Sequence, residues 1–297
     1  MEARIVVIGL GLIGGSFALA LRNAWPSVAI TGIDRDDANL DEALRRGAID
    51  AVGAIDDGAA VRDADVILLA VPVRQLPAVL AGLAPHLQAN TVITDVGSTK
   101  QDVAAVARTA LGERARQFVP AHPIAGREHS GMAAAATELF DDRTVVLTPL
   151  AENSADDVNR VKMLWQACGA RAVEMTAATH DEIFAAVSHL PHMLAFALVD
   201  EFAARPNAKS LFSFAASGFR DFTRIASSSP EMWRDIALNN RTALVAEMDR
   251  YLRHAGELRD AIAAGDSVKI NTLMQRAQQA REHWLAGELE HFRDESA

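Results

Sequence analysis

The chain has 297 residues, of which half are hydrophobic and 23% are charged, so it can form two globular domains or one large one. Its formal net charge is −10, and no cluster of Lys and Arg offsets that charge. This balance argues against a nucleic-acid-binding surface, because binding to phosphates depends on clustered cations. An anionic ligand would have to be held by a few local cations.

A glycine-rich turn stands close to the start of the chain. Residues 5–8 (IVVI) predict a strand, and GLGLIG follows at 9–14, before an apolar stretch that predicts a helix. The GxGxxG spacing is typical of a dinucleotide-binding turn: the first glycine permits the bend, the second admits a pyrophosphate, and the third lets helix and strand pack closely. The pyrophosphate would meet unpaired N–H groups at the helix start. The predicted cofactor contacts here are Gly9, Gly11, Leu12, Ile13 and Gly14.

A second apolar run, 28–33, leads directly into Asp34. A carboxylate at this position accepts hydrogen bonds from the ribose of NAD and repels the 2′-phosphate of NADP. NAD is therefore the expected cofactor. The neighbouring Arg35 keeps NADP as an alternative, because a guanidinium could hold that phosphate or stack on adenine.

The first 21 residues also allow a secretory signal, since Arg4 precedes a long apolar stretch. The three glycines in register, and the lack of a clear small-residue cleavage site, favour the dinucleotide turn. The single cysteine, Cys168, excludes an intramolecular disulfide and suits a reducing cytoplasm. We expect no other segment to be apolar for long enough to cross a bilayer, and hence no membrane association.

The pattern of the chain changes at about Thr176. Before it, short apolar or β-branched runs alternate with helical stretches, and after it apolar residues recur at helical spacing, as at Leu244 and Leu252. We predict an α/β, Rossmann-type, doubly wound and mostly parallel sheet in a dinucleotide-binding domain over 1–176, then an all-α domain over 177–297. The expected strands are 5–8, 28–33, 66–71, 91–94, 117–121, 144–148 and 171–175.

The long amphipathic helices of the second half carry more apolar surface than about 120 residues can cover alone. We therefore expect a homodimer formed through this half, with a compact monomeric bundle as the alternative. Within it, Ser229 and Pro230 are typical of a helix start, and Gly265 should separate the last two helices.

Ligands of open α/β sheets collect at the carboxyl ends of the strands, so the residues just after each apolar run are site candidates. Val71 and Pro72 end the run 66–71 beside the expected cofactor. Ser98 and Lys100 follow the run 91–94 and offer a hydroxyl and an ammonium near the nicotinamide. Helix N-capping is the alternative role for Ser98.

His122 follows the run 117–121 and is the candidate catalytic acid or base. An imidazole can hold or release a proton near neutral pH, and oxidation of an alcohol by NAD needs a proton acceptor at the hydroxyl. A purely structural histidine is the alternative. Gly126 should keep the following loop open, and His129 is expected on the surface.

The helical half holds two further candidate segments. In SHLPH at 188–192, Pro191 should break helical register, so we expect no metal pair but a Ser188 hydroxyl or an imidazole, at His189 or His192, facing the cleft. The second segment, GFRDFTR at 218–224, brings guanidinium groups that bind carboxylates and aromatic residues that line small-molecule pockets. We expect Arg224 to bind substrate, while Arg220 could do so or pair with Asp221 or Glu231.

Together these motifs resemble those of prephenate dehydrogenase, including its arogenate and cyclohexadienyl forms. The resemblance covers nearly the whole chain. It rests on GLGLIGGS at 9–16, DVGSTK at 95–100, HPIAG at 122–126, SHLPH at 188–192, and FRDFTRIA at 219–226 followed by MWRD at 232–235. The glycine turn is shared by many families, whereas the last three segments together are highly specific.

The resemblance implies an NAD-dependent oxidative decarboxylation in tyrosine biosynthesis, in which hydride leaves C4 of a cyclohexadiene and the ring carboxylate is lost as carbon dioxide. By this resemblance His122 matches the histidine that takes the C4 hydroxyl proton, and Ser98 a serine near that hydroxyl. Arg224 matches an arginine that binds a substrate carboxylate, and His192 a histidine near the substrate side chain. The resemblance further implies that Arg220 can come from the partner subunit and that Glu128 is an acidic gate over the pocket.

Two other functions stay open at this point. A dehydrogenase of the β-hydroxyacid type would need a catalytic lysine, for which the helical half offers only Lys209 and Lys269. A non-catalytic NAD(H)-binding regulator would not need His122, Ser98 and Arg224 together. The choice between prephenate and arogenate is also open.

Overall fold

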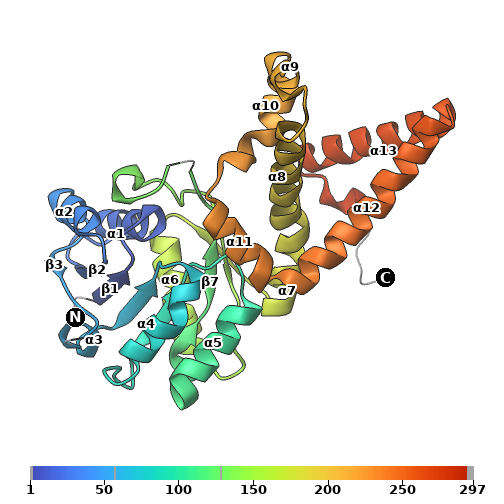
Figure 1. Ribbon diagram of the computed structural model, residues 1–297. Coiled ribbons are helices and arrows are strands. Elements are labelled where there is room, and N and C mark those ends of the chain that lie inside the picture. Colours follow the sequence, from blue (N-terminus) through green and yellow to red (C-terminus); the bar gives the residue numbers. More distant parts are fainter. Residues whose placement is uncertain (1–2, 57, 128, 293–297) are drawn as a thin grey trace. The chain divides into compact units, whose positions relative to one another are not determined.

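The computed structural model describes residues 3–56, 58–127 and 129–292. The chain divides into two compact units, residues 1–244 and 245–297. The first unit contains a six-stranded parallel sheet (Figure 1) with the strand order β3-β2-β1-β4-β5-β6. This is the order of a doubly wound Rossmann sheet, so the predicted fold class is confirmed. The strands are β1 (Arg4–Ile8), β2 (Ala29–Ile33), β3 (Ala51–Val52), β4 (Val66–Leu69), β5 (Val92–Asp95) and β6 (Phe118–Val119).

The sheet has an apolar layer on each face, because its central strand is hydrophobic at every buried position. In β1, Ile5 and Val7 belong to one core cluster, whereas Val6 and Ile8 belong to the other, as the two-residue period of a strand requires. The first cluster includes residues of α1 (Leu12–Ala24) and α6 (Ala155–Ala167), and the second includes residues of α4 (Leu76–Leu83) and α5 (Gln101–Leu111). The remaining helices of this part are α2 (Asp37–Arg45) and α3 (Ala59–Arg62).

The predicted strand over 117–121 is wrong as a single strand. Pro120, which has no N–H to donate to a ladder, separates β6 from β7 (Ala121–Pro123), and β7 belongs to a second sheet with the order β7-β8-β9. In this sheet β8 (Thr144–Leu147) runs antiparallel to β7 and parallel to β9 (Arg171–Glu174). His122 therefore lies within a strand, opposite Val146, and not in the loop after one.

Helices follow β9 throughout the described part of the chain, which confirms the predicted all-α second half. Ser229 caps α11 through its hydroxyl, Pro230 is the first residue of that helix, and Asp266, after Gly265, caps α13. A division into domains after Thr176 stays a prediction. The helices are α7 (Ala177–Phe184), α8 (Leu190–Ala203), α9 (Ala208–Ser213), α10 (Ser217–Thr223), α11 (Pro230–Asn239), α12 (Arg241–Ala263) and α13 (Ser267–Ala286).

Pro191 does not break the helix, contrary to expectation. A π-helical turn, Ala185–His189, joins α7 to α8 and widens the backbone just before the proline; such a turn shifts the carbonyl that a proline ring would strike in a regular α-helix. The continuous run Ala177–Ala203 contains an 18-residue window with a mean hydropathy of 1.5 and is long and apolar enough, by length and composition, to cross a membrane. We expected no segment after the first 21 residues to be apolar for long enough to cross a bilayer, and this expectation is therefore wrong.

Candidate active site

The glycine turn has the geometry that its sequence predicts. Gly9 has a φ of 93°, and a Cβ there would strike the carbonyl oxygen of Ala70. A Cβ at Gly14 would strike the carbonyl of Gly9, whereas one at Gly11 would meet nothing within 4 Å. Gly9 and Gly14 are thus required by close packing, and Gly11 leaves open space at the start of α1.

That open space lies where a diphosphate would bind. Gly11 is the N-cap of α1, no side chain caps the helix, and its first turn contains no acidic residue. The free N–H groups and the helix dipole therefore face the space beside Gly11 and favour an anion. Leu12 and Ile13, which begin the helix, are half-buried.

The other predicted cofactor residues lie at the carboxyl ends of neighbouring strands. Asp34 follows β2, and its carboxylate accepts N–H bonds from Leu10 at 2.6 Å and Asp36 at 2.9 Å. Val71 and Pro72 follow β4, which pairs with β1 at the point where the strand order reverses. Ligands of doubly wound sheets bind at this switch point. Arg35 is exposed.

The position of Lys100 in the sequence suggested that its ammonium would face the nicotinamide, but the structure shows that it does not. It is completely buried, and its Nζ lies 2.6 Å from Asp95 Oδ2 and donates to the Ala121 carbonyl at 2.8 Å. Asp95 also accepts the N–H of Ala121 at 3.1 Å. Lys100 therefore ties the end of β5 to the strand that carries His122. The alternative role of Ser98 as a helix N-cap is excluded, because α5 begins at Gln101 with Lys100 as its N-cap.

His122 is half-buried and stands at one end of a hydrogen-bonded chain. Its Nδ1 lies 2.9 Å from Nε2 of His180, whose Nδ1 lies 2.8 Å from Asp181 Oδ1. Both partners are buried and come from α7. Phe184, from the same helix, packs its ring against both imidazoles, at centroid distances of 5.1 and 4.5 Å. His180 and Asp181 were not among the residues predicted for the site, because they carry no sequence motif beyond being adjacent to each other.

The surroundings keep the His122 imidazole neutral. Burial lowers its pKa well below 6.5, and repulsion from His180, when that imidazole is protonated, from the Lys100 ammonium and from a protonated His189 adds to that effect. Burial also lowers the pKa of His180, against the opposing effect of its bond to Asp181. Burial raises the pKa of Asp181, but hydrogen bonds from His180 and backbone N–H groups outweigh it and lower that pKa. At neutral pH the chain thus consists of two neutral imidazoles and a carboxylate.

The SHLPH segment contributes two imidazoles to the same unit. His189 is buried, its Nδ1 lies 3.1 Å from Asn240 Nδ2, and burial lowers its pKa to about 4. It also hydrogen-bonds the backbone of Ser98, whose own side chain is half-buried. His192 is half-buried, and its Nδ1 lies 2.9 Å from the carbonyl oxygen of Ser188.

The predicted cations of the helical half differ in their surroundings. Burial lowers the pKa of His192, and the positive charge of Arg224 lowers it further, so this guanidinium lies near the imidazole. The ring of Trp233 stacks on His192 at 3.6 Å. Arg220 is exposed on α10, and Glu231, one of its suggested partners, lies 3.6 Å from Arg234 instead.

In the loop after β7, Gly126 is exposed with open space at its Cα, and Glu128 lies outside the described residues.

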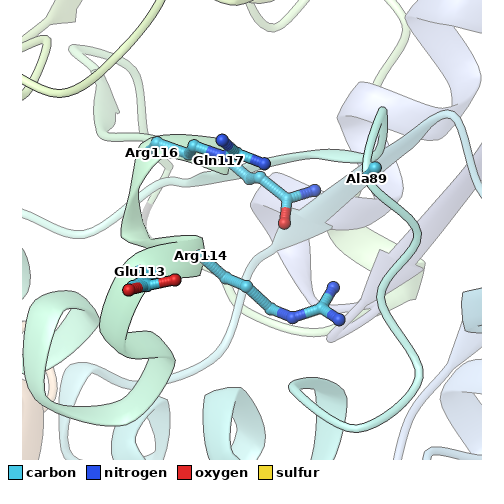
Figure 2. Close-up of a pocket in the computed structure, with 5 residues that line it drawn as sticks. All are labelled: Ala89, Glu113, Arg114, Arg116 and Gln117. Atoms are coloured by element: carbon cyan, nitrogen blue, oxygen red, sulfur yellow. The ribbon is translucent and has the colours of Figure 1, made fainter.

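Two other features of the described residues do not belong to this site. A surface pocket of about 270 Å³ (Figure 2) is lined by Ala89, Glu113, Arg114, Arg116 and Gln117. These residues precede β5 and β6, so the pocket lies at the amino ends of the strands, opposite the ligand-binding edge. In the second unit, potential ligand atoms of His283, Glu288 and His291 lie within 4.8 Å of one another. His189 and His192 form no such group.

The chain is similar to known proteins along nearly its whole length. Residues 17–174 match the family model of the prephenate dehydrogenase nucleotide-binding domain, and residues 176–276 match that of the prephenate dehydrogenase dimerization domain. The chain is 39% identical to a prephenate dehydrogenase of Bacillus subtilis (strain 168), over 95% of this chain and 76% of that protein. It is 37% identical to a cyclohexadienyl dehydrogenase of Zymomonas mobilis subsp. mobilis, over 93% of this chain and 94% of that one.

A solved structure is similar over the same extent. The crystal structure of prephenate dehydrogenase from A. aeolicus, in complex with hydroxyphenyl propionate and NAD+, aligns with a TM-score of 0.88 and 32% identity, covering 95% of this chain and 98% of that one. The similarity therefore includes both the sheet and the helices that carry the candidate site.

Proposed function

Because the chain belongs to the prephenate dehydrogenase family, we propose that it catalyses the NAD-dependent oxidative decarboxylation of prephenate, arogenate or both. The observation that carries this proposal is the neutral, half-buried imidazole of His122, held by a hydrogen bond to His180 in the same unit as a dinucleotide-binding turn. Membership of this family of dehydrogenases argues against a β-hydroxyacid enzyme and against a non-catalytic regulator.

The cofactor proposal rests on the fit of the glycine turn to a dinucleotide. The α1 N–H groups and the space at Gly11 would take the pyrophosphate, and Asp34 would take the ribose and disfavour a 2′-phosphate. Val71, Pro72 and the backbone near Ser98 would border the nicotinamide. NAD supplies the hydride acceptor for the reaction.

The protein's own residues would handle the proton and the carboxylates. We propose that Nε2 of His122 takes the C4 hydroxyl proton as the C4–H bond releases its electron pair as hydride. The bond from the ring to its carboxylate then breaks, carbon dioxide leaves, and the bonding electrons make the ring aromatic. Ser98 would hydrogen-bond the C4 hydroxyl. Arg224 would hold a carboxylate, and His192 would lie near the substrate side chain.

The direct test is turnover by the purified protein. With NAD and either prephenate or arogenate, we expect reduced cofactor and carbon dioxide to form in equal amounts. Comparing kcat/KM for the two substrates would identify the preferred one. Absence of turnover with both substrates would refute the proposed reaction, even if NAD bound tightly.

Arg224→Ala is predicted to raise KM. A hydrogen bond to a charged group contributes about 1.5 to 3 kcal/mol, so loss of the guanidinium should lower kcat/KM about 10- to 100-fold, mainly through KM. Steady-state kinetics would measure the change. Arg205→Ala is the matched control, because Arg205 is a partly exposed arginine paired with Glu201 on α8. An unchanged KM in Arg224→Ala would assign this arginine a structural role only.

The acid limb of the pH profile should reflect the neutral state of His122. The base must be unprotonated to act, and its pKa lies below 6.5, so activity should be retained at pH 6.5 and lost only as pH falls through that lower pKa. The quantity to measure is kcat/KM, which reports the free enzyme. A single acid limb centred at pH 7 or above would contradict this assignment.

We further propose that the protein is a homodimer formed through its helical half, in line with the matched dimerization domain. In the second unit, the apolar side chains of α12 and α13 are largely exposed in a single chain. In the first unit, only 17% of the most apolar window of the run Ala177–Ala203 is buried. This run also carries His180, Asp181 and His192, so a protein partner suits it better than lipid. The free, buried Cys168 supports a cytoplasmic location.

The dimer proposal predicts that charges on α12 will separate the subunits. Val245 and Leu252 are seven residues apart, share one helix face and are 50% and 59% exposed. We expect Val245→Glu/Leu252→Glu to sediment as a monomer where the wild-type chain sediments with the mass of two chains. Arg259→Ala, on the same helix and exposed, should leave the mass unchanged. A monomeric wild-type protein at micromolar concentration would refute the dimer.

A further inference from the structure

The chain from Asp181 through His180 to His122 contains two buried side chains to which the proposed reaction assigns no role. The bond between His122 and His180 joins residues 58 positions apart, because β7 carries His122 and α7 carries both partners. Two imidazoles and one carboxylate in series leave few allowed arrangements of hydrogens. The position of the proton on His122 therefore follows from its neighbours.

Asp181 determines the tautomer of His180. Its carboxylate is an acceptor, so Nδ1 of His180, 2.8 Å away, must donate. Because His180 is neutral, it carries no second hydrogen, and its Nε2 presents a lone pair. That lone pair lies 2.9 Å from Nδ1 of His122.

The lone pair of His180 in turn determines the tautomer of His122. Two lone pairs cannot form a hydrogen bond, so Nδ1 of His122 must carry the hydrogen. Its Nε2 then has the lone pair, and within the described residues that atom makes no hydrogen bond. Nε2 is the ring atom that can accept a proton from a substrate.

We propose that His180 and Asp181 are positioning residues that hold His122 as its Nδ1–H tautomer and so make Nε2 the proton acceptor. This inference rests on the proposed function for its catalytic meaning, but the tautomer itself can be measured without substrate. When Nε2 accepts the hydroxyl proton, His122 becomes an imidazolium that still donates from Nδ1 to His180. The Asp181 carboxylate, one imidazole further on, favours that positive charge.

The carboxylate is itself held rigidly. Asp181 Oδ1 also accepts the N–H of Lys100 at 2.8 Å, and Oδ2 accepts that of Gln101 at 2.9 Å, so the side chain caps the start of α5. Its own carbonyl accepts from Asn240 Nδ2 at 2.7 Å. Because each carboxylate oxygen is already engaged with the backbone, Asp181 cannot rotate away from His180 without uncapping α5.

The tautomer can be tested by nitrogen NMR of the full-length protein labelled with ¹⁵N-histidine. Protonated and unprotonated ring nitrogens have separate shifts, and the His122 signals are identified by their loss in His122→Asn. We expect Nδ1 to be protonated in the wild-type protein. In His180→Leu, which offers no acceptor, we expect the hydrogen to move to Nε2. A wild-type His122 protonated at Nε2 would overturn the inference.

Kinetics test whether this tautomer matters. We expect His180→Leu to lower kcat about 10- to 10³-fold, with KM and NAD affinity changed by no more than about threefold. His180→Gln places an amide oxygen near the former Nε2. It should therefore restore the Nδ1–H form of His122 and have a kcat at least tenfold above that of His180→Leu. Equal activity of the two variants, or wild-type kcat in His180→Leu, would refute the positioning role.

Phe184→Leu is the matched packing control. Phe184 contacts both imidazoles but takes no part in the hydrogen-bonded chain. Its replacement should loosen the packing while the Nδ1–H tautomer of His122 persists. A change of tautomer in this variant would mean that packing, and not His180, sets the proton position. If wild-type His122 is protonated at Nδ1 but neither cyclohexadiene is oxidised, the tautomer assignment stands and the proposed function fails.

Discussion

Replacing His122 with Asn should lower kcat by about 10² to 10⁴, which is the usual contribution of a general acid or base. The Asn amide can reach the position of Nδ1 and still donate to His180, so the local structure should be kept. It offers no proton acceptor at the position of Nε2. The loss should therefore fall on kcat, with NAD affinity nearly unchanged, because the predicted cofactor contacts lie in the glycine turn and at Asp34.

Steady-state kinetics and a fluorescence titration with NAD would measure the two quantities. His129→Asn is the matched control, since His129 is exposed in the loop after β7 and should keep full activity. An unchanged kcat in His122→Asn would remove this residue from the chemistry. A large loss of NAD affinity would instead mean that the substitution disturbs the cofactor site.

Lys100→Met should destabilise the fold by about 3 to 5 kcal/mol, the cost of removing one partner from a buried ion pair. Lys100 is completely buried and Asp95 is 1% exposed. Removing the ammonium leaves the carboxylate with an uncompensated charge and also leaves the Ala121 carbonyl without its donor. Urea denaturation would measure the change in the free energy of unfolding.

Two further variants make the cause specific. Lys162→Met removes a partly exposed lysine that lies 3.3 Å from Glu174, and it should cost no more than about 1 kcal/mol because such pairs are solvated. Adding Asp95→Asn to Lys100→Met should recover part of the stability, since the buried charge is then gone. If Lys100→Met unfolds with the wild-type free energy, the pair does not stabilise the fold.

Local patterns predicted much of the fold. The strands expected at 5–8 and 28–33 are β1 and β2, because their apolar or β-branched residues favour extended backbone on a buried sheet. The glycine turn needed no tertiary information either, since its spacing reflects contacts among the turn, the helix and one strand. Local patterns failed at Pro120, because a two-residue strand before this proline and a three-residue strand after it look like one continuous apolar run.

The dinucleotide turn, the doubly wound sheet, the helical second half and the candidacy of His122 could all be predicted from local sequence, because each depends on residues close together in the chain. Which groups surround that histidine depends on the folding of distant segments. His122 lies 58 positions from His180, and Asp181 caps a helix 81 positions earlier. Such contacts form only when α7 packs beside β7 and α5, and no local spacing encodes them. Lys100, which looked like a group facing the nicotinamide, is a buried partner of Asp95, and it is held there by the carbonyl of Ala121 on β7, 21 positions later.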